Sequence, residues 1–254
     1  MRAGAGVGVV LVAVMVPGCG GSDAGAGDED ARTAEAPAAN ADMAETPAQD
    51  TAWIALFDGT DLSAWRGYRR PDLPPAWQAR DGLLTFVPGE EGGDIVTREQ
   101  FDDFELELDW RVGPAGNSGV FYRASEDFEV IWHGAPELQI LDDAGHADGQ
   151  DPMTSAAAAY ALYPPSQQVV KPAGEWNEVR VVARGPHVEH WLNGVKVVEY
   201  EAGSEDWNQR VAGSKFAEYP GFGEARRGHI GLQDHGDTVW FRDIRVRPIA
   251  GVDR

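Results

Sequence analysis

The sequence predicts an all-β protein built as a sandwich of two antiparallel sheets. Segments that alternate apolar with polar residues recur at short spacing, and turns that contain glycine separate them. The 31 Gly and nine Trp among 254 residues favour short strands and turns over a helical bundle, and no alternation of strand and helix patterns appears. The chain length suits one domain of this class once its N-terminal stretch is set aside.

The N-terminal stretch predicts export. Arg2 precedes an apolar run at residues 7–16, which is too short to span a bilayer as a helix and is typical of a signal peptide. The run ends in a Val-Pro-Gly-Cys sequence that is similar to a bacterial lipobox. Residues 1–18 are therefore predicted to be a lipoprotein-type signal peptide, and Cys19 the lipidation site. The predicted location is the cell envelope, lipid-anchored on the periplasmic or outer face; an ordinary secretory signal, with release to the periplasm, is the alternative.

Residues 19–51 are predicted to form a disordered acidic linker. From residue 20 to residue 50, eight acids accompany a single base, Arg32, with no aromatic residue. Such a segment buries too little apolar surface to offset the entropy of ordering. The formal net charge of −21 argues against nucleic acid as a partner, whereas neutral sugars remain compatible.

The folded domain is predicted over residues 52–250. A first strand at 54–57 leads into an Asp-Gly turn, after which Trp65 is expected to pack back onto the core. Residues 77–86 read as strand, Asp-Gly turn and strand, which predicts a hairpin. Residues 104–112 alternate apolar with charged residues, which predicts a strand with one solvated face.

The next two strands carry candidate site residues. Residues 117–123 place Asn117 and Arg123 on one face of a strand. The strand that follows directs Glu137 and Gln139 outward and the apolar residues between and after them inward.

A long segment and a second hairpin follow. Residues 143–170 show little pattern, and a loop of this length is expected to shape a ligand site. A strand at 174–183 precedes a hairpin at 188–200, in which Asn193-Gly194 is assigned to the turn. Residues 206–216 form the single helix predicted, and its pattern is weak.

The last two predicted strands, 229–233 and 239–246, flank a tight turn. Gln233, Asp234 and His235 lie where the first of these strands ends. They form either part of a site or a solvated hairpin, and spacing alone does not decide between the two.

The chain lacks several familiar catalytic motifs. It has no Gly-x-Ser-x-Gly, no phosphate loop, no dinucleotide motif and no helical His-x-x-x-His zinc pair, and its six His are scattered. Polar faces of neighbouring strands in one sheet can line a single concave surface, and with Trp and Tyr such a surface suits sugars. The residues alone therefore lead to an exported β-sandwich with a candidate carbohydrate-binding face.

Six motifs occur in a fixed order along the domain. They are residues 56–65, 117–123, 137–142, 171–177, 190–194 and 228–236. Together they closely resemble the 3-keto-disaccharide hydrolase family, formerly a domain of unknown function, over residues 53–248. The resemblance implies a concanavalin A-like jelly roll. It also implies an extracytoplasmic enzyme that cleaves glycosides whose sugar a separate sugar 3-dehydrogenase has oxidised at C3.

The implied chemistry assigns roles to the candidate residues. A ketone at C3 acidifies the C2 proton, so a base can remove it, the enolate can expel the C1 substituent, and water can then add. On this hypothesis Glu137 or His235 is the base. Arg123, or one divalent cation held by carboxylate, Gln and His, stabilises the enolate. The expected substrate-binding residues are Asn117, Gln139, Asp142, His190, Gln233 and Asp234.

Two other functions stay open at this point. A non-catalytic, lectin-like module would retain a 3-keto-glycoside without cleaving it. A passive scaffold of an envelope complex would bind protein partners and no sugar. The natural aglycone, the anomeric preference, the metal requirement and the oligomeric state do not follow from the sequence.

Overall fold

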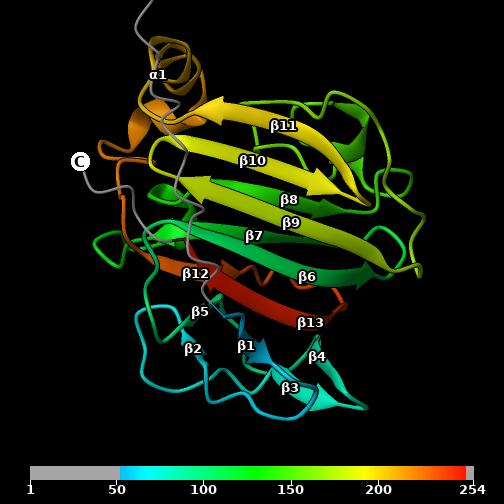
Figure 1. The fold of residues 1–254 in the computed structure, drawn as a ribbon. Helices are drawn as coiled ribbons and strands as arrows, with labels where there is room; N and C mark the ends of the chain where they lie inside the picture. Colours follow the sequence, from blue (N-terminus) through cyan, green and yellow to red (C-terminus); the bar gives the residue numbers. More distant parts are fainter. Residues whose placement is uncertain (1–51, 250–254) are drawn as a thin grey trace, which may run out of the picture. The chain divides into compact units, whose positions relative to one another are not determined.

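The structure is a computed structural model, and it describes residues 52–249 (Figure 1). The predicted signal peptide, Cys19 and the whole predicted acidic linker lie outside the described residues. Within residues 52–249, no helix has the length and apolar character needed to cross a membrane.

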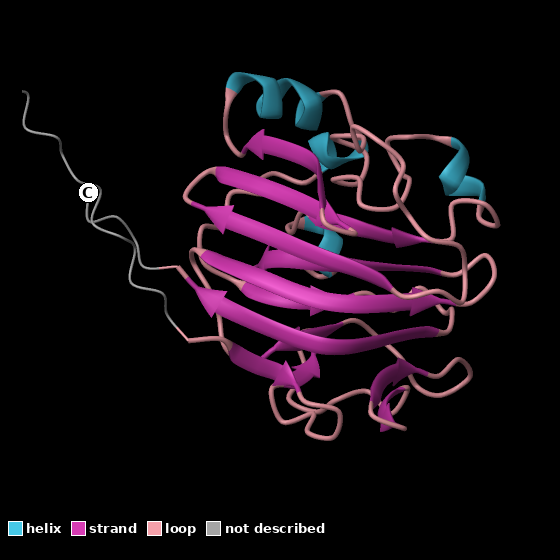
Figure 2. Ribbon diagram, turned by 45° about the vertical axis from the view of Figure 1, so that its right-hand side comes forward, coloured by secondary structure: helices cyan, strands magenta, loops and turns pink. Residues whose placement is uncertain are grey.

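Two antiparallel sheets lie one behind the other (Figures 1 and 2), as the sequence predicts. Sheet A has the order β11-β10-β9-β6-β13-β4-β3, with β1 also paired to β13, and sheet B has the order β2-β5-β12-β7-β8. The strands of sheet A are β1 (Ile54–Phe57), β3 (Trp77–Arg80), β4 (Leu83–Phe86), β6 (Phe104–Val112), β9 (Asn177–Arg184), β10 (His187–Leu192), β11 (Val195–Glu201) and β13 (Val239–Pro248). Those of sheet B are β2 (Trp65–Gly67), β5 (Ile95–Thr97), β7 (Asn117–Ala124), β8 (Glu137–Leu141) and β12 (His229–Leu232).

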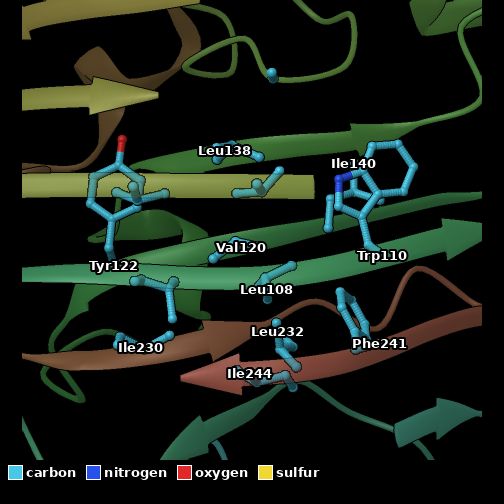
Figure 3. Packing of buried hydrophobic residues seen from close by; sticks show 14 of the residues in the cluster. Leu108, Trp110, Val120, Tyr122, Leu138, Ile140, Ile230, Leu232, Phe241 and Ile244 are labelled. Carbon is cyan, nitrogen blue, oxygen red and sulfur yellow. The ribbon is translucent and has the colours of Figure 1, made fainter. Parts of the chain in front are cut away.

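The core fills the space between the sheets. Figure 3 shows Trp110 and Phe241 of sheet A packing with side chains of sheet B such as Val120 and Leu138, and all four are buried. Trp65 is also fully buried, and its indole Nε1 donates to the Leu56 carbonyl at 2.8 Å. Its expected packing against the core is thus confirmed.

Both hairpins that the sequence predicts are present. The β3–β4 turn places Asp81 at φ 51° and Gly82 at φ 78°, and the β10–β11 turn places Asn193 at φ 50° and Gly194 at φ 81°. Positive φ at both central residues matches the right-handed twist of the flanking strands, and Asn, Asp and Gly tolerate it best. The assignment of Asn193 and Gly194 to a turn is confirmed.

The last two strands do not form a hairpin. β12 lies in the middle of sheet B between β5 and β7, whereas β13 lies in sheet A between β6 and β4. The segment between them therefore crosses from one sheet to the other. Alternation shows that a segment is a strand, but it does not show which sheet receives that strand.

A helical segment caps one end of the sandwich. It comprises α1 (Glu205–Ala212) and the short 3₁₀ helix η3 (Lys215–Glu218), and it lies beyond β11 at the top of Figure 2. Ser204 caps α1 by accepting a hydrogen bond from the Trp207 amide at 3.1 Å, and the Trp207 side chain is buried. The weak helix predicted over 206–216 is thus a true helix followed by a 3₁₀ turn. Two further 3₁₀ helices are η1 (Ile131–His133) and η2 (Ala147–Gln150).

Candidate active site

A cavity of about 250 Å³ lies against the face of sheet B that points away from sheet A. Its volume is near the lower end of ligand pockets, roughly 300–1,000 Å³, and suits one sugar ring. The residues that line it are Asn117, Trp132, Glu137, Gln139, Asp148, Tyr160, Lys215, Gln233 and His235. Five of the predicted site residues are therefore brought together from three neighbouring strands or strand ends.

The pleat of β8 directs its two polar side chains into the cavity. Leu138 and Ile140 join the core between the sheets, so Glu137 and Gln139 face the opposite way, as predicted. Gln139 pairs with Gly119 of β7. A Cβ atom at Gly119 would collide with the Glu137 carboxylate, so glycine at this position makes room for that group.

Glu137 is the most strongly perturbed acid in the cavity. Its side chain is 8% exposed, and burial raises its pKa to about 8. The nearby Lys215 ammonium opposes this shift, while Asp94 and Asp148 add to it. A carboxyl group with this pKa can exchange a proton near neutral pH and, when ionised, is a stronger base than an ordinary carboxylate.

The long loop after β8 does shape the cavity. Its backbone extends the edge of β8, because the Ala157 amide donates to the Gln139 carbonyl at 2.8 Å and the Tyr160 amide to the Glu137 carbonyl at 3.0 Å. The small side chains of the alanine run, residues 156–159, are all buried in this contact. The loop thereby brings Tyr160 and Asp148 to the cavity wall. Burial, together with the carboxylates of Asp148 and Glu137, raises the pKa of Tyr160 to about 12.

Two buried amide groups point to a ligand. Asn117 is 3% exposed and Gln139 is 1% exposed, and neither Asn117 Oδ1 nor Gln139 Oε1 has a hydrogen-bond partner within the described chain. A buried oxygen without a donor is costly, by roughly 1–3 kcal/mol. Both atoms lie at a cavity wall, where hydroxyl groups of a bound sugar would supply the missing donors.

His235 and Gln233 complete the wall from the end of β12. The His235 ring is half exposed, with Nε2 3.5 Å from Asn117 Nδ2 and Nδ1 3.8 Å from an oxygen of Asp237. The Gln233 backbone is fixed to β7, since its amide donates to the Gly119 carbonyl at 2.9 Å and its carbonyl accepts from Ser118 Oγ at 2.8 Å. Of the two alternatives that the sequence left open, a site or a solvated hairpin, this placement favours a site for Gln233 and His235.

Four cavity residues were missed by the sequence analysis: Trp132, Asp148, Tyr160 and Lys215. Lys215 Nζ lies 4.6 Å from the centroid of the Trp132 ring and 4.4 Å from that of Tyr160. The available signal was the scarcity of lysine, because only three of the 21 basic residues of the chain are Lys. Trp132 comes from η1, and its ring packs edge-on against Tyr219 at 5.2 Å.

Arg123 does not reach the cavity. β7 advances by three residues from Phe121 to Ala124, whereas the part of β12 that pairs with it advances by only two. β7 therefore carries a bulge at this point, and Arg123 within it has φ 53°. The bulge takes Arg123 out of the face that it was predicted to share with Asn117. Its guanidinium instead donates to the carbonyls of Asp102 and Gly185 and forms an ion pair with Asp103 at 3.1 Å. The proposed catalytic role of Arg123 is therefore not supported.

His190 also lies elsewhere. It belongs to β10 of sheet A, is fully buried, and bonds the Tyr122 hydroxyl at 2.9 Å and the Ala157 carbonyl at 3.0 Å. Burial lowers its pKa to about 4, so it stays neutral in the core. It supports the loop that contains the alanine run, residues 156–159, from the core side, and it does not line the cavity.

Asp142 and Asp234 brace loops. Asp142 is 8% exposed and accepts a hydrogen bond from the Ala115 amide at 2.8 Å. Asp234 accepts from the amides of Gly93 at 2.6 Å and Gly236 at 2.8 Å. Neither lines the cavity, so both are corrected from substrate-binding to structural residues.

The His and carboxylate side chains of the cavity do not by themselves form a cluster of three ligands. Within residues 52–249, only His187, Glu189 and Glu199 bring three His, Cys, Asp or Glu ligand atoms within 4.8 Å of one another. They lie on the β10–β11 hairpin, where the Lys196 ammonium already pairs with Glu189 and Glu199. The positive charge that the cavity itself provides is that of Lys215.

The chain is similar to a known domain family and to several known proteins. The model of the 3-keto-alpha-glucoside-1,2-lyase-like domain matches residues 52–247. A 3-keto-disaccharide hydrolase of Bacteroides thetaiotaomicron is 36% identical over 240 residues, which cover 83% of each protein. Two crystal structures of proposed glycosyl hydrolases from Parabacteroides distasonis are each 31% identical and cover 78% of this chain. Their TM-scores are 0.73 and 0.60, with 94% and 99% of those chains covered.

Proposed function

The chain belongs to the 3-keto-alpha-glucoside-1,2-lyase-like family, and from this premise we propose that it hydrolyses the C1 glycosidic bond of 3-keto-glycosides. The observation that carries the proposal is the meeting of a buried carboxyl group, Glu137, with two unpaired amide oxygens in one cavity of sugar size. The amides account for binding, and the carboxyl group accounts for chemistry.

The reaction starts at C2 of the oxidised sugar. The Glu137 carboxylate removes the C2 proton, and the electron pair of that bond moves to the C3 oxygen to form an enolate. When the ketone re-forms, a C1–C2 double bond appears and the C1–oxygen bond breaks. The departing oxygen takes a proton, for which His235 is the half-exposed donor in the cavity wall.

Hydration closes the cycle. Water adds its oxygen to C1 of the unsaturated ketone and gives one proton to His235, which restores the proton that His235 lost to the leaving group. The proton on Glu137 exchanges with solvent, and Glu137 then protonates C2. The products are a 3-keto sugar and the free aglycone, and Glu137 is again a carboxylate. The route does not use the pair of opposed carboxylates that ordinary glycoside hydrolysis employs.

The buried amides set the preference for a hydroxylated ring. Asn117 Oδ1 and Gln139 Oε1 accept hydrogen bonds, so they require donors from the ligand, and Gln233 adds a third amide at the same wall. A sugar ring provides such donors around its edge, whereas an apolar ligand would leave both oxygens unsatisfied.

The direct test is incubation with a 3-keto-disaccharide and, in parallel, with the same disaccharide unoxidised. We expect sugar release from the oxidised substrate alone, with deuterium incorporated at C2 when the reaction is run in D₂O. Equal cleavage of both substrates, or release without deuterium at C2, would contradict the mechanism.

A carbohydrate-binding module without catalysis is the second candidate, because unpaired amide oxygens bind sugars equally well in a lectin. Retention of the 3-keto-disaccharide without any release would identify that function.

We further propose that Cys19 carries a lipid that anchors the protein in the bacterial envelope, where a sugar 3-dehydrogenase supplies the substrate. The sequence around Cys19 supports this assignment. Cys19→Ser should move the protein from the membrane fraction to the soluble fraction of the cell, and unchanged fractionation would refute the anchor.

A further inference from the structure

Lys215 is held at the cavity by a rigid support. It is the first residue of η3, and Ser214 caps this turn by accepting a hydrogen bond from the Phe216 amide at 3.1 Å. The Phe216 ring is buried and stacks on Phe222 with a centroid distance of 4.0 Å. The residue that follows Lys215 thus anchors the turn in the core, which limits the positions open to the lysine side chain.

Two aromatic rings hold the ammonium group itself. Lys215 as a whole is solvent-exposed, but its Nζ lies over the rings of Trp132 and Tyr160. A cation over a ring face gains about 0.5–2 kcal/mol, depending on how far it is desolvated. Ring faces fix the position of a charge without neutralising it.

The charge of Lys215 has no opposite partner in contact. Among the residues that the structure describes, no carboxylate lies within 4.0 Å of Nζ, and Lys215 is the one lysine or arginine that lines the cavity. Burial lowers its pKa, while the more distant Glu137 and Asp148 raise it. Arg123, the other candidate cation, has its donors occupied at the far end of β7.

We propose that Lys215 is a catalytic residue that stabilises the negative charge on the C3 oxygen when the C2 proton is removed. This inference rests on the proposed function, because that reaction creates an enolate. A ketone oxygen carries little charge and an enolate oxygen nearly a full one, so a fixed ammonium binds the intermediate more strongly than the substrate. No covalent bond to lysine is required, and the proton removed from C2 remains on Glu137.

The variant Lys215→Met tests this role, with Lys196→Met as the matched control. Lys196 pairs with Glu189 and Glu199 on the outer face of sheet A and lies away from the cavity. We expect Lys215→Met to lower kcat on the 3-keto-disaccharide by roughly 100- to 1,000-fold, the size of effect seen when one oxyanion donor is removed. Deuterium exchange at C2 should fall by a similar factor, and Lys215→Arg should recover part of the loss. Lys196→Met should behave as the wild type.

The pH profile separates a catalytic role from a structural one. Lys215 lowers the pKa of Glu137, so Lys215→Met should move the alkaline rise of kcat/KM to higher pH. Thermal unfolding of Lys215→Met close to that of the wild type would confirm that the fold is intact. If Lys215→Met misfolds, Lys215→Gln provides the same comparison, again with Lys215→Arg as the variant that keeps the charge.

The results of these experiments separate the proposed function from the proposed role of Lys215. A wild-type protein that releases no sugar would overturn the proposed function itself. Suppose instead that the wild type cleaves the substrate and that Lys215→Met keeps more than a third of kcat with an unshifted pH profile. That result would overturn only the role of Lys215. A variant in which KM rises and kcat is unchanged would make Lys215 a substrate-binding residue and would also overturn the catalytic role.

Discussion

The outer faces of the two sheets both carry polar side chains, but these side chains differ in how they are paired. On sheet A a groove of about 780 Å³ is lined by charged side chains such as Glu107 and Asp109. These carboxylates pair with Arg245 and Arg242 of the neighbouring strand. On sheet B the smaller cavity contains a buried acid and two amide oxygens without partners. Cavity size alone therefore does not identify the site, whereas a cavity that brings a buried acid together with unpaired amide oxygens does.

The physical reason is that pairing removes the need for a ligand. A partly exposed ion pair is already satisfied by its partner and by water, and it contributes little stability. A buried acceptor without a donor destabilises the empty protein, and a ligand that provides the donor removes that cost. The contrast can be tested by variants on each face.

The largest effect is expected from Glu137→Gln. Loss of the base should reduce kcat by about 1,000-fold or more, at the upper end of the contribution of general base catalysis. The fold should remain intact, since Gln has nearly the same shape. Activity within tenfold of the wild type on a 3-keto-disaccharide would remove Glu137 from the mechanism.

The same variant should be more stable than the wild type at high pH. Burial raises the pKa of Glu137 from 4.5 to about 8, so the folded protein favours the protonated form. The contribution of that proton to the free energy of unfolding is fully present below pH 4.5. It declines above that value and is lost as the pH rises through 8. Glutamine does not ionise, so the advantage of Glu137→Gln in unfolding free energy should grow by about 2–4 kcal/mol from pH 5.5 to pH 9. Urea unfolding at both values measures it, and an equal gap at both would contradict the raised pKa.

Arg123→Met should affect stability and leave catalysis unchanged. The substitution removes the ion pair with Asp103 and the donors to two backbone carbonyls, all at a site where Arg123 is 5% exposed. We expect the folded state to lose about 2–4 kcal/mol. For the folded fraction kcat should stay within twofold of the wild type. A 100-fold loss of kcat without loss of stability would restore the catalytic role first expected for this residue.

Arg123 also shows where sequence reasoning ends. Alternation correctly places Glu137 and Gln139 on one face, because β8 is regular and its period of two has no interruption. The same rule fails for Arg123, because the bulge before Ala124 shifts the phase and no residue in the motif announces it. The rule fails for His190 for another reason. Alternation shows which side chains of a strand share a face, but it does not show whether that face lines the core or a site.

The residues that the sequence analysis missed share one property. Trp132, Tyr160 and Lys215 come from short helical turns or loops, and they reach the cavity through tertiary packing. Loops and single turns carry no repeating pattern from which a face could be assigned. The strands of the fold and the strand-borne part of the site were therefore predictable, and the loop-borne part required the three-dimensional structure.

A smaller effect is expected from Gln139→Met, which replaces a buried amide by an apolar side chain of similar length. The unpaired Oε1 disappears, so stability should be unchanged or higher by about 1 kcal/mol. The hydrogen bond to the sugar is lost as well, and kcat/KM should fall about tenfold. A loss of stability without a change in kcat/KM would indicate that Gln139 supports the sheet and does not bind substrate.

The smallest effect is expected on the outer face of sheet A, from Asp109→Asn combined with Arg242→Gln. The two side chains are 2.8 Å apart and 18% and 39% exposed. Burial raises the pKa of Asp109 even though Arg242 donates to it, so desolvation offsets most of the attraction. A double-mutant cycle should therefore give a coupling below about 1 kcal/mol, with kcat/KM within twofold of the wild type. A tenfold loss of kcat/KM would show that the paired face also takes part in substrate binding, and the distinction between paired and unpaired polar groups would no longer locate the site.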